Sequence, residues 1–137
     1  MKIVLDTNVV VSGLLNPHGP PGQIVSMVAA GKLALYYDAR ILDEYLAVLS
    51  RSRFEFSIEH IEALLAQVRV VGELVAPRPL RQRLPDPEDE KFLEAAIAAD
   101  AAYLVTGNLR HYPASSRQGI EVATPAEFLE VLRESRG

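Results

Sequence analysis

The sequence of 137 residues contains no cysteine. This absence excludes a disulfide scaffold, a thiolate metal site and a cysteine nucleophile. Any bound metal must therefore be held by oxygen ligands or by the three histidines, His18, His60 and His111, which are too widely spaced for a zinc-type cluster. A hard cation bound by carboxylates fits this composition better.

Long apolar runs and an excess of positive charge are also missing. No apolar run approaches the roughly 20 residues that span a bilayer, and Asp6 interrupts the N-terminal run too early for a signal peptide. We therefore expect a soluble, cytoplasmic protein with no membrane contact. The net charge of −4 argues against a broadly basic surface. A local basic stripe, Arg78, Arg81 and Arg83, is equally consistent with binding nucleic acid and with a solvated loop.

Strand-like and helix-like segments alternate along most of the chain. The expected strands cover residues 3–5, 33–37, 70–75, 101–105 and 120–123. Helical patterns mark the segments between the first four strands and the segment after the last one. Turn-forming residues predict loops at residues 16–22 and 76–85. The alternation predicts one α/β domain over residues 1–137, a three-layer α/β/α arrangement around a central, mostly parallel five-stranded sheet.

Four local signals predict where individual helices begin or end. Gly31 is placed to end the helix that precedes the second strand. Ser57 and Asp86 are candidate N-caps, the latter followed by a proline at the first helical position. Residues 124–127, TPAE, form a capping box for the last helix.

Two aspartates follow expected strands, Asp6 after the first and Asp38 after the second. Taken alone, Asp6 is better explained as a turn or cap residue, because it is followed by Thr7 and Asn8, which also favour turns and caps. However, ligands of open α/β sheets bind at the carboxyl ends of the strands. The rest of the chain decides between these interpretations.

Further acids lie on the expected helices. Apolar residues with a period near 3.6 predict a helix at residues 39–50, and both Asp43 and Glu44 lie off its apolar face. Periodicity alone does not show which of the two acids belongs to the site. Asp89 falls near the middle of the apolar face that carries Phe92, which is costly for a carboxylate without a partner. Glu90 points about 100° away from that apolar face and is more easily explained as a solvated residue. A capping role for Asp89 beside Asp86 is the alternative.

These acids are expected to meet at one edge of the sheet. All strands of a parallel sheet end at the same edge, so Asp6 and the turn of Thr106, Gly107 and Asn108 lie there, and the helix that Asp89 opens starts there. No Ser-His-Asp or Cys-His arrangement accompanies them. Clustered carboxylates repel one another, so a divalent cation that neutralises them explains the pattern.

The sequence resembles a PIN-domain ribonuclease of the VapC-like toxin group of toxin–antitoxin systems. The matching stretches are VLDTNVVVSGLL, DEYLAVLSR, DPEDEKFLEAAIAADAAYLVTGN and HYP, which occur in the expected order over nearly the whole chain. The resemblance implies a PIN-like fold and an endoribonuclease that depends on Mg²⁺ or Mn²⁺. It also implies an RNA substrate, and it suggests a small antitoxin partner and a homodimer.

By position, the resemblance implies that Asp6, Glu44 and Asp89 are the metal ligands and catalytic acids, which resolves the choice between Asp43 and Glu44. A shift of the third acid to Asp86 or Glu90 stays open. Many members have a further acid where this chain has Asn108. The amide oxygen of Asn108 can ligate a metal or a metal-bound water but brings no charge, which weakens the case for two tightly held ions. The expected supporting groups are Thr7, Asn8, Thr106 and Asn108, and the expected contacts to the RNA backbone are Arg78, Arg81, Arg83 and Arg110.

Other classes fit less well. A receiver-like phosphoacceptor domain needs an aspartate after its third strand and a lysine after its fifth, and neither is present. A haloacid-dehalogenase-type phosphatase needs a second acid where Asn8 stands. The main alternative is a PIN fold that has lost catalysis and binds RNA or protein, which Asn108 supports and the retained acids oppose.

Overall fold

A computed structural model describes residues 1–136. Its single sheet has the order β3-β2-β1-β4-β5, and every neighbouring pair is parallel. The strands are β1 (Lys2–Leu5), β2 (Ala34–Tyr37), β3 (Glu73–Leu74), β4 (Tyr103–Val105) and β5 (Val122–Ala123). The predicted α/β fold with a central five-stranded sheet is confirmed, and the sheet is parallel throughout.

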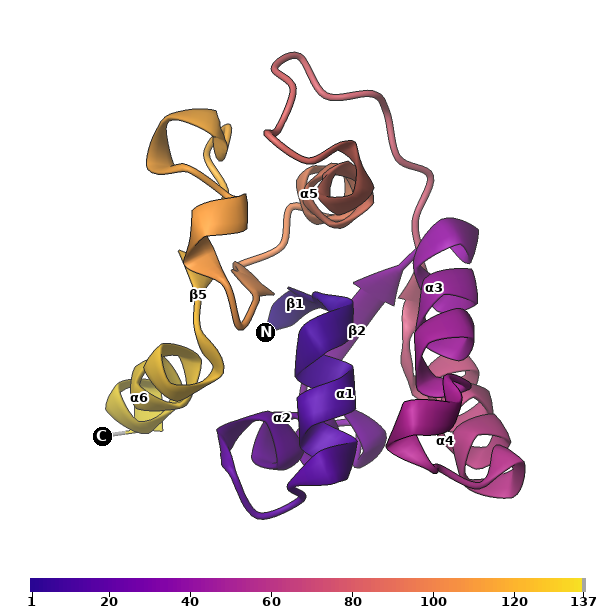
Figure 1. Cartoon of the computed structure of the whole chain (residues 1–137). Helices are drawn as coiled ribbons and strands as arrows, with labels where there is room; N and C mark the ends of the chain where they lie inside the picture. Colours follow the sequence, from indigo (N-terminus) through magenta and orange to yellow (C-terminus); the bar gives the residue numbers. More distant parts are fainter. Residues whose placement is uncertain (137) are drawn as a thin grey trace.

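Helices cover both faces of the sheet. They are α1 (Thr7–Leu15), α2 (Pro20–Ala29), α3 (Ala39–Leu49), α4 (Ile58–Val71), α5 (Glu90–Ala99) and α6 (Pro125–Arg136), with 3₁₀ turns η1 (Ser52–Phe54), η2 (Pro87–Asp89), η3 (Leu109–His111) and η4 (Ala114–Ser116). Figure 1 shows α5 on one side of the sheet and α1, α2, α4 and α6 on the other. These are the three layers that the sequence predicts.

The strand order reverses at the centre of the sheet. From β1 the chain moves outward to β2 and β3, and then returns through α5 to β4, on the other side of β1. The crevice outside the carboxyl ends of β1 and β4 is therefore a topological switch point, the place where open α/β sheets bind ligands. Asp6 and Thr106 directly follow these two strands.

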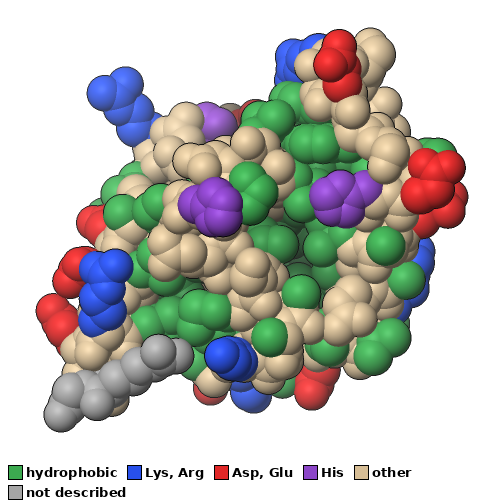
Figure 2. Space-filling view, turned by 90° about the horizontal axis from the view of Figure 1, so that it is seen from below, with side chains coloured by type: hydrophobic (Ala, Val, Ile, Leu, Met, Phe, Trp, Pro, Cys, Tyr) green, Lys and Arg blue, Asp and Glu red, His purple; other side chains and the backbone are tan. Residues whose placement is uncertain are grey.

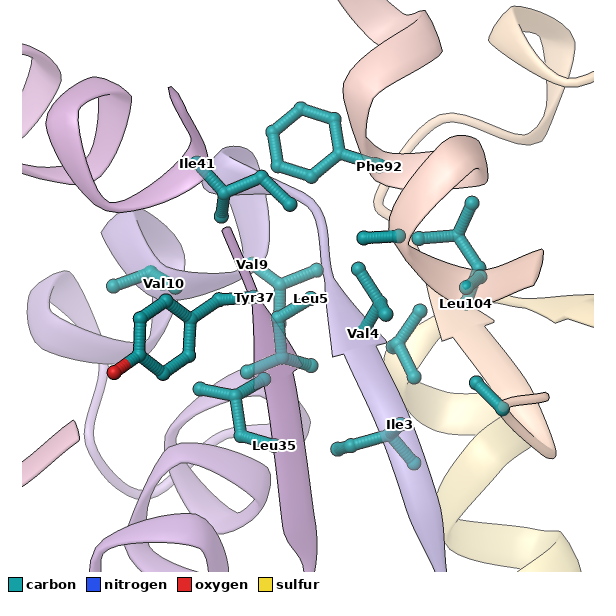
Figure 3. Packing of buried hydrophobic residues seen from close by; sticks show 14 of the residues in the cluster. Ile3, Val4, Leu5, Val9, Val10, Leu35, Tyr37, Ile41, Phe92 and Leu104 are labelled. Atoms are coloured by element: carbon teal, nitrogen blue, oxygen red, sulfur yellow. The ribbon is translucent and has the colours of Figure 1, made fainter. Parts of the chain in front are cut away.

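The core is built around β1. Ile3, Val4 and Leu5 are all buried, as expected for a central strand of a parallel sheet that helices cover on both faces. Figure 3 shows them among side chains of the neighbouring strands and of three helices, including Leu35, Leu104, Val9, Ile41 and Phe92. This packing gives the segment that follows β1 a fixed position.

Several predicted helix boundaries are confirmed. The Ser57 hydroxyl accepts a hydrogen bond from the His60 amide, 3.2 Å. Glu127 and Thr124 exchange the two bonds of a capping box, at 2.9 and 3.2 Å. Gly31 follows α2 with a φ of +75°, a left-handed conformation that suits glycine.

The two largest boundary errors concern α2 and β3, while the strands expected at 101–105 and 120–123 each begin two residues later than predicted. The loop expected at residues 16–22 ends early, because α2 begins at Pro20, and a proline is well suited to the first helical position. The strand expected at residues 70–75 is only Glu73–Leu74, because α4 continues through Val70 and Val71. A short β-branched run is compatible with either a strand or the end of a helix.

The surface carries apolar areas in addition to charge. Figure 2 shows hydrophobic side chains gathered around a hollow between two histidines on the face seen from below.

Among residues 1–136, no helix combines the length and the apolar character needed to cross a bilayer.

Candidate active site

Asp6 lies at the carboxyl end of β1 with its side chain buried, 5% exposed. It occupies the N-cap position of α1 but makes no capping hydrogen bond with its side chain. Instead, its Oδ2 atom accepts hydrogen bonds from the Thr106 hydroxyl and the Tyr112 hydroxyl, both 3.0 Å. The carboxylate is therefore held mainly by residues that follow β4 rather than by capping α1.

Burial raises the pKa of Asp6 above its usual range, although the hydrogen bonds from Thr106 and Tyr112 and the nearby backbone amide of Asn8 oppose this effect. The charge of Glu44 raises the pKa further. Burial also raises the pKa of Tyr112, which the neighbouring carboxylates raise further. The Tyr112 hydroxyl therefore remains protonated and donates to Asp6 at any ordinary pH. The two hydroxyls occupy Oδ2 and leave Oδ1 free of them.

Asp89 closes η2 and stands at the N-terminus of α5, 8% exposed. Its Oδ2 atom is buried and has no hydrogen-bond partner among the described residues. The Nδ1 atom of His111 lies 3.3 Å from it. Burial and then the charge of Asp6 raise the pKa of Asp89 to about 6, against the lowering effect of His111. Asp89 is thus a buried carboxylate that lacks full compensation.

Glu44 projects from α3 toward the same edge and is held on both oxygens. The Thr7 hydroxyl donates to Oε2, and the Lys91 ammonium lies 2.8 Å from Oε1. The Lys91 side chain is only 12% exposed, so this ion pair is well shielded from solvent. Asp43, the alternative on the same helix, is exposed.

The turn after β4 connects these acids to α1. Thr106, which donates to Asp6, accepts from the Asn108 amide at 3.1 Å, and the Asn8 carboxamide oxygen accepts from the Gly107 amide at 2.9 Å. A Cβ atom at Gly107 would lie 3.2 Å from that oxygen, so this close approach favours glycine. Three of the four residues predicted as supporting groups, Asn8, Thr106 and Asn108, therefore share one hydrogen-bonded region, whereas Thr7 bonds Glu44.

The side chain of Asn108 orients His111. Its Oδ1 atom accepts from the Arg110 amide, 3.2 Å, so its Nδ2 atom faces the His111 Nε2 atom at 2.9 Å. An amide nitrogen donates, and Nε2 must then accept. This arrangement leaves the proton of a neutral His111 on Nδ1, the atom that faces Asp89.

The remaining predicted residues have other contacts. Asp86 caps η2 through the Glu88 amide, 2.9 Å. Glu90 accepts from the Leu84 amide at 2.9 Å and pairs with Arg83 at 3.0 Å, and these bonds lower its pKa. Glu90 thus secures the end of the 76–85 loop, whereas Asp86 caps η2 and its carbonyl oxygen accepts from the Asp89 amide at 3.1 Å. No side-chain hydrogen bond or ion pair joins either acid to the carboxylate of Asp6 or Asp89 in the described chain.

Of the other arginines, only Arg110 lies on the turn beside the acids, where it is exposed. Arg78 and Arg81 line a separate groove of about 850 Å³ against α5, which also includes Glu94 and Gln118. The basic stripe expected from the sequence is therefore divided, because Arg78 and Arg81 line the groove while Arg83 pairs with Glu90.

The donor atoms of the acid cluster have the chemistry that a divalent cation prefers. Asp6 and Asp89 are buried, the charge of Asp6 raises the pKa of Asp89, and Asp89 retains an oxygen without a hydrogen bond. Carboxylate oxygens are the preferred ligands of Mg²⁺. Glu44 is already bound by Thr7 and Lys91. Within residues 1–136, no three acids or histidines are grouped closely enough to hold one ion together. The donors therefore fit an ion on Asp6 and Asp89 better than a three-acid cage.

Comparison with known families agrees with this arrangement. The profile of the family described as PIN domain matches residues 2–110, which include Asp6, Glu44, Asp89 and Asn108. The chain belongs to the PIN-domain family. An uncharacterized protein of Methanocaldococcus jannaschii, MJ1680, is 30% identical over 95% of this chain and 90% of that protein.

A solved structure shares the fold of this PIN domain. It is the crystal structure of VapBC2 from Rickettsia felis bound to a DNA fragment from their promoter; the match covers 90% of this chain and 98% of the matched chain, with a TM-score of 0.59 and 17% identity. The recognition of a PIN-domain, VapC-like fold is confirmed. The ligand roles of Asp6, Glu44 and Asp89 stay predictions.

Sequence reasoning assigned no role to three residues of the site: Lys91, His111 and Tyr112. Each contacts an acid that is distant in sequence, with Tyr112 and Asp6 separated by 106 positions. Lys91 lies two positions after Asp89, but nothing in the spacing predicts that it pairs with Glu44 on another helix. The stretch HYP was part of the family resemblance, and this was the only signal for His111 and Tyr112.

Proposed function

We propose that this PIN domain is a metal-dependent endoribonuclease and the toxin component of a toxin–antitoxin pair. The observation that carries the proposal is the pair of buried carboxylates, Asp6 and Asp89, at the topological switch point of a PIN-family sheet. Such a pair is costly to bury unless an ion or substrate compensates it. The similarity of the fold to a chain of VapBC2 supports the toxin assignment.

In this proposal, Asp6 and Asp89 hold Mg²⁺ or Mn²⁺. The ion, when bound, lowers the pKa of water and stabilises charge on the phosphate. Thr106 and Tyr112 fix the orientation of Asp6 through hydrogen bonds, and His111, itself oriented by Asn108, faces Asp89 at 3.3 Å. Glu44, held by Thr7 and Lys91, orients the attacking water.

The RNA backbone passes over the turn that follows β4. Arg110 is the arginine best placed to contact a phosphate there, because it is exposed and lies next to Asn108 and His111. Arg78 and Arg81 contact a more distant part of the strand, and Arg83 contributes less because Glu90 neutralises it. Binding should weaken steeply with salt.

A small antitoxin would restrain this activity. An arginine of that partner entering the acid cluster would compensate Asp6 and Asp89 as a cation does, through charge-assisted hydrogen bonds. A second copy of the chain is a further candidate partner. The apolar area around the hollow in Figure 2 is a candidate surface for such contacts.

The test is cleavage of a mixture of structured and single-stranded RNAs with Mg²⁺ or Mn²⁺. EDTA and an identically purified Asp6→Asn protein are the controls. We expect cleavage that requires the ion and disappears in Asp6→Asn. Equal cleavage by both proteins would reveal a contaminating nuclease and would contradict the proposal.

The second candidate is a PIN fold without catalysis that binds RNA or protein. Asn108, at a position where many relatives have an acid, and the pairing of Glu44 with Lys91 favour it. It predicts RNA binding in EDTA that Asp6→Asn does not alter, with no cleavage under any metal. Titration of Mn²⁺ against the wild type and Asp89→Asn distinguishes the candidates, because only the nuclease needs an ion at these acids.

A further inference from the structure

A small groove lies beside the acid cluster and is separate from it. It has a volume of about 280 Å³, and it is formed by α1, the first turn of α2, the turn after β4 and the start of α6. Pockets for drug-sized ligands are typically about 300–1,000 Å³. The groove therefore has room for one small chemical group rather than a drug-sized ligand.

The lining combines apolar surfaces with neutral polar groups. Val9 and Pro125 are buried and provide an apolar floor, while Pro21 and the exposed Ser12 line it farther out. None of the described residues that line the groove is charged. A phosphate or a cationic side chain would find no countercharge there, whereas a neutral heterocycle with polar edges matches both kinds of surface.

The polar edge of the groove retains hydrogen-bonding capacity. Asn8 and Asn108 both line it, and each carboxamide has already formed bonds that fix its orientation. A carboxamide offers two donors and two acceptor lone pairs, so each side chain keeps groups for a ligand. Carboxamides read nucleobase edges with such pairs of groups.

One residue separates the groove from the acids. The Thr106 hydroxyl donates to Asp6 at 3.0 Å and accepts from the amide of Asn108, and the Asn8 side chain approaches the same hydroxyl at 3.5 Å. A nucleotide whose phosphate lies at Asp6 therefore has its base, or that of its neighbour, within reach of the groove. Proteins that read single-stranded RNA commonly bind splayed bases in this way.

We propose that this groove is a nucleobase subsite that selects the base next to the scissile phosphate. Asn8 and Asn108 read the edge of the base, and Val9, Pro21 and Pro125 cover its apolar surface. The inference rests on the proposed function for the identity of the substrate as RNA. It assigns to Asn108 a specificity role in a position where many relatives have an acid.

Ser12→Trp provides the test variant, because Ser12 is exposed on α1 and a tryptophan there would fill the groove. Ser26→Trp on α2 is the matched control, since Ser26 is also an exposed helical serine and does not line the groove. Neither residue contacts an acid of the cluster through a described hydrogen bond.

The four nucleosides are titrated separately into the ¹⁵N-labelled full chain in EDTA, and amide shifts are recorded. We expect one nucleoside to shift the amides of Asn8, Gly107 and Asn108 at the lowest concentration. Ser12→Trp should weaken this binding at least about tenfold, and Ser26→Trp should leave it unchanged. N-acetyl-leucine amide, which imitates an apolar side chain of a protein partner, is titrated in parallel.

Absence of shifts with every nucleoside would overturn the subsite, as would binding that Ser12→Trp does not weaken. Shifts with N-acetyl-leucine amide alone would overturn it in favour of a protein contact. RNA cleavage is measured on the same samples with Mn²⁺, so the two proposals fail separately. Nucleoside binding without cleavage would keep the subsite and count against the nuclease, and cleavage without nucleoside binding would do the reverse.

Discussion

Asp6 and Asp38 follow neighbouring parallel strands and are equally buried, each 5% exposed, yet their surroundings differ. Asp38 caps α3 through the Ile41 amide at 3.1 Å and pairs with Arg40 at 2.7 Å. Asp6 has no cap and no cation, and its neighbours within range include Asp89 and Glu44. The same residue type at the same edge of the sheet thus serves two purposes.

The difference follows from the direction of the chain after each strand. The chain leaves β2 into α3, and Arg40, two residues later, can return to Asp38. After β1, the residues that reach Asp6 come from the turn beyond β4, across the switch point. Asp38 is therefore compensated locally, while Asp6 faces a crevice whose compensation comes from elsewhere, in our proposal from an ion.

The largest expected effect separates the two aspartates by activity. Asp6→Asn preserves the shape of the side chain and removes its charge. We expect it to lower the RNA cleavage rate by more than about 100-fold, the upper range for residues that only support a metal ligand. Asp38→Asn should leave the rate within a few-fold of the wild type. The measurement is cleavage under single-turnover conditions with Mn²⁺, and equal losses in both variants would contradict the distinction.

The second effect separates them by stability. Asp38→Ala removes an N-cap, which typically costs about 0.5–2 kcal/mol, whereas the exposed Arg40 adds little. Asp6→Asn should leave the free energy of unfolding unchanged or raise it, because it removes a buried charge that other acids repel. Urea denaturation in EDTA measures both values. A larger loss in Asp6→Asn than in Asp38→Ala would reverse the comparison.

The third effect is a pH dependence at Asp89. Its pKa is raised from 3.8 to about 6 in the folded state. The folded chain therefore binds this proton more tightly than the unfolded chain, so the contribution favours folding at low pH and is lost as the pH rises from about 4 to about 6. A shift of this size corresponds at most to about 3 kcal/mol, and solvent access reduces it to about 1–2 kcal/mol.

Asp89→Asn removes this loss. In EDTA, its free energy of unfolding relative to the wild type should increase between pH 4 and pH 6.5 and then stay constant. Asp38→Asn, compared in the same way, serves as the control. A difference between Asp89→Asn and the wild type that does not change with pH would show that Asp89 is compensated in the folded protein, as Asp38 is.

The sequence predicted the strands and turns that carry Asp6 and Asp38, but not the difference between the surroundings of the two acids. Apolar runs located all five strands, although β3 is much shorter than expected, and parallel topology then placed Asp6 and Asp38 at one edge. What separates the two acids is contact with side chains far along the chain, such as Tyr112, which local spacing does not encode. The errors at Pro20 and Val70 arose where one local pattern suits two structures.

The acids on helices also show that local spacing predicts burial better than it predicts contacts with distant side chains. The apolar face of α5 predicted that Asp89 points inward, and the structure confirms that Asp89 is buried. For α3, periodicity did not choose between Asp43 and Glu44, because both lie off its apolar stripe. The decisive contacts of Glu44 come from Thr7 on α1 and Lys91 on α5. Only the packing of three helices at one edge of the sheet reveals them.

The smallest effect tests how Asp6 is held. Tyr112→Phe removes one of the two hydroxyls that bond Oδ2, while Thr106 still donates to the same atom. Loss of such a supporting bond typically costs about 10–100-fold in metal affinity or activity. Because Thr106 remains, we expect about tenfold weaker Mn²⁺ binding by calorimetry, with a lower kcat and an unchanged KM for RNA.

Tyr45→Phe is the control for Tyr112→Phe, because Tyr45 is equally buried and its hydroxyl donates to the Leu5 carbonyl oxygen at 2.6 Å, not to an acid. Both variants lose one buried hydrogen bond, worth about 1 kcal/mol of stability. If only Tyr112→Phe weakens Mn²⁺ binding, the hydroxyl acts by orienting Asp6. Equal weakening in both would mean that Tyr112 merely stabilises the fold, and Asp6 would then be held in place by Thr106 and the backbone of β1.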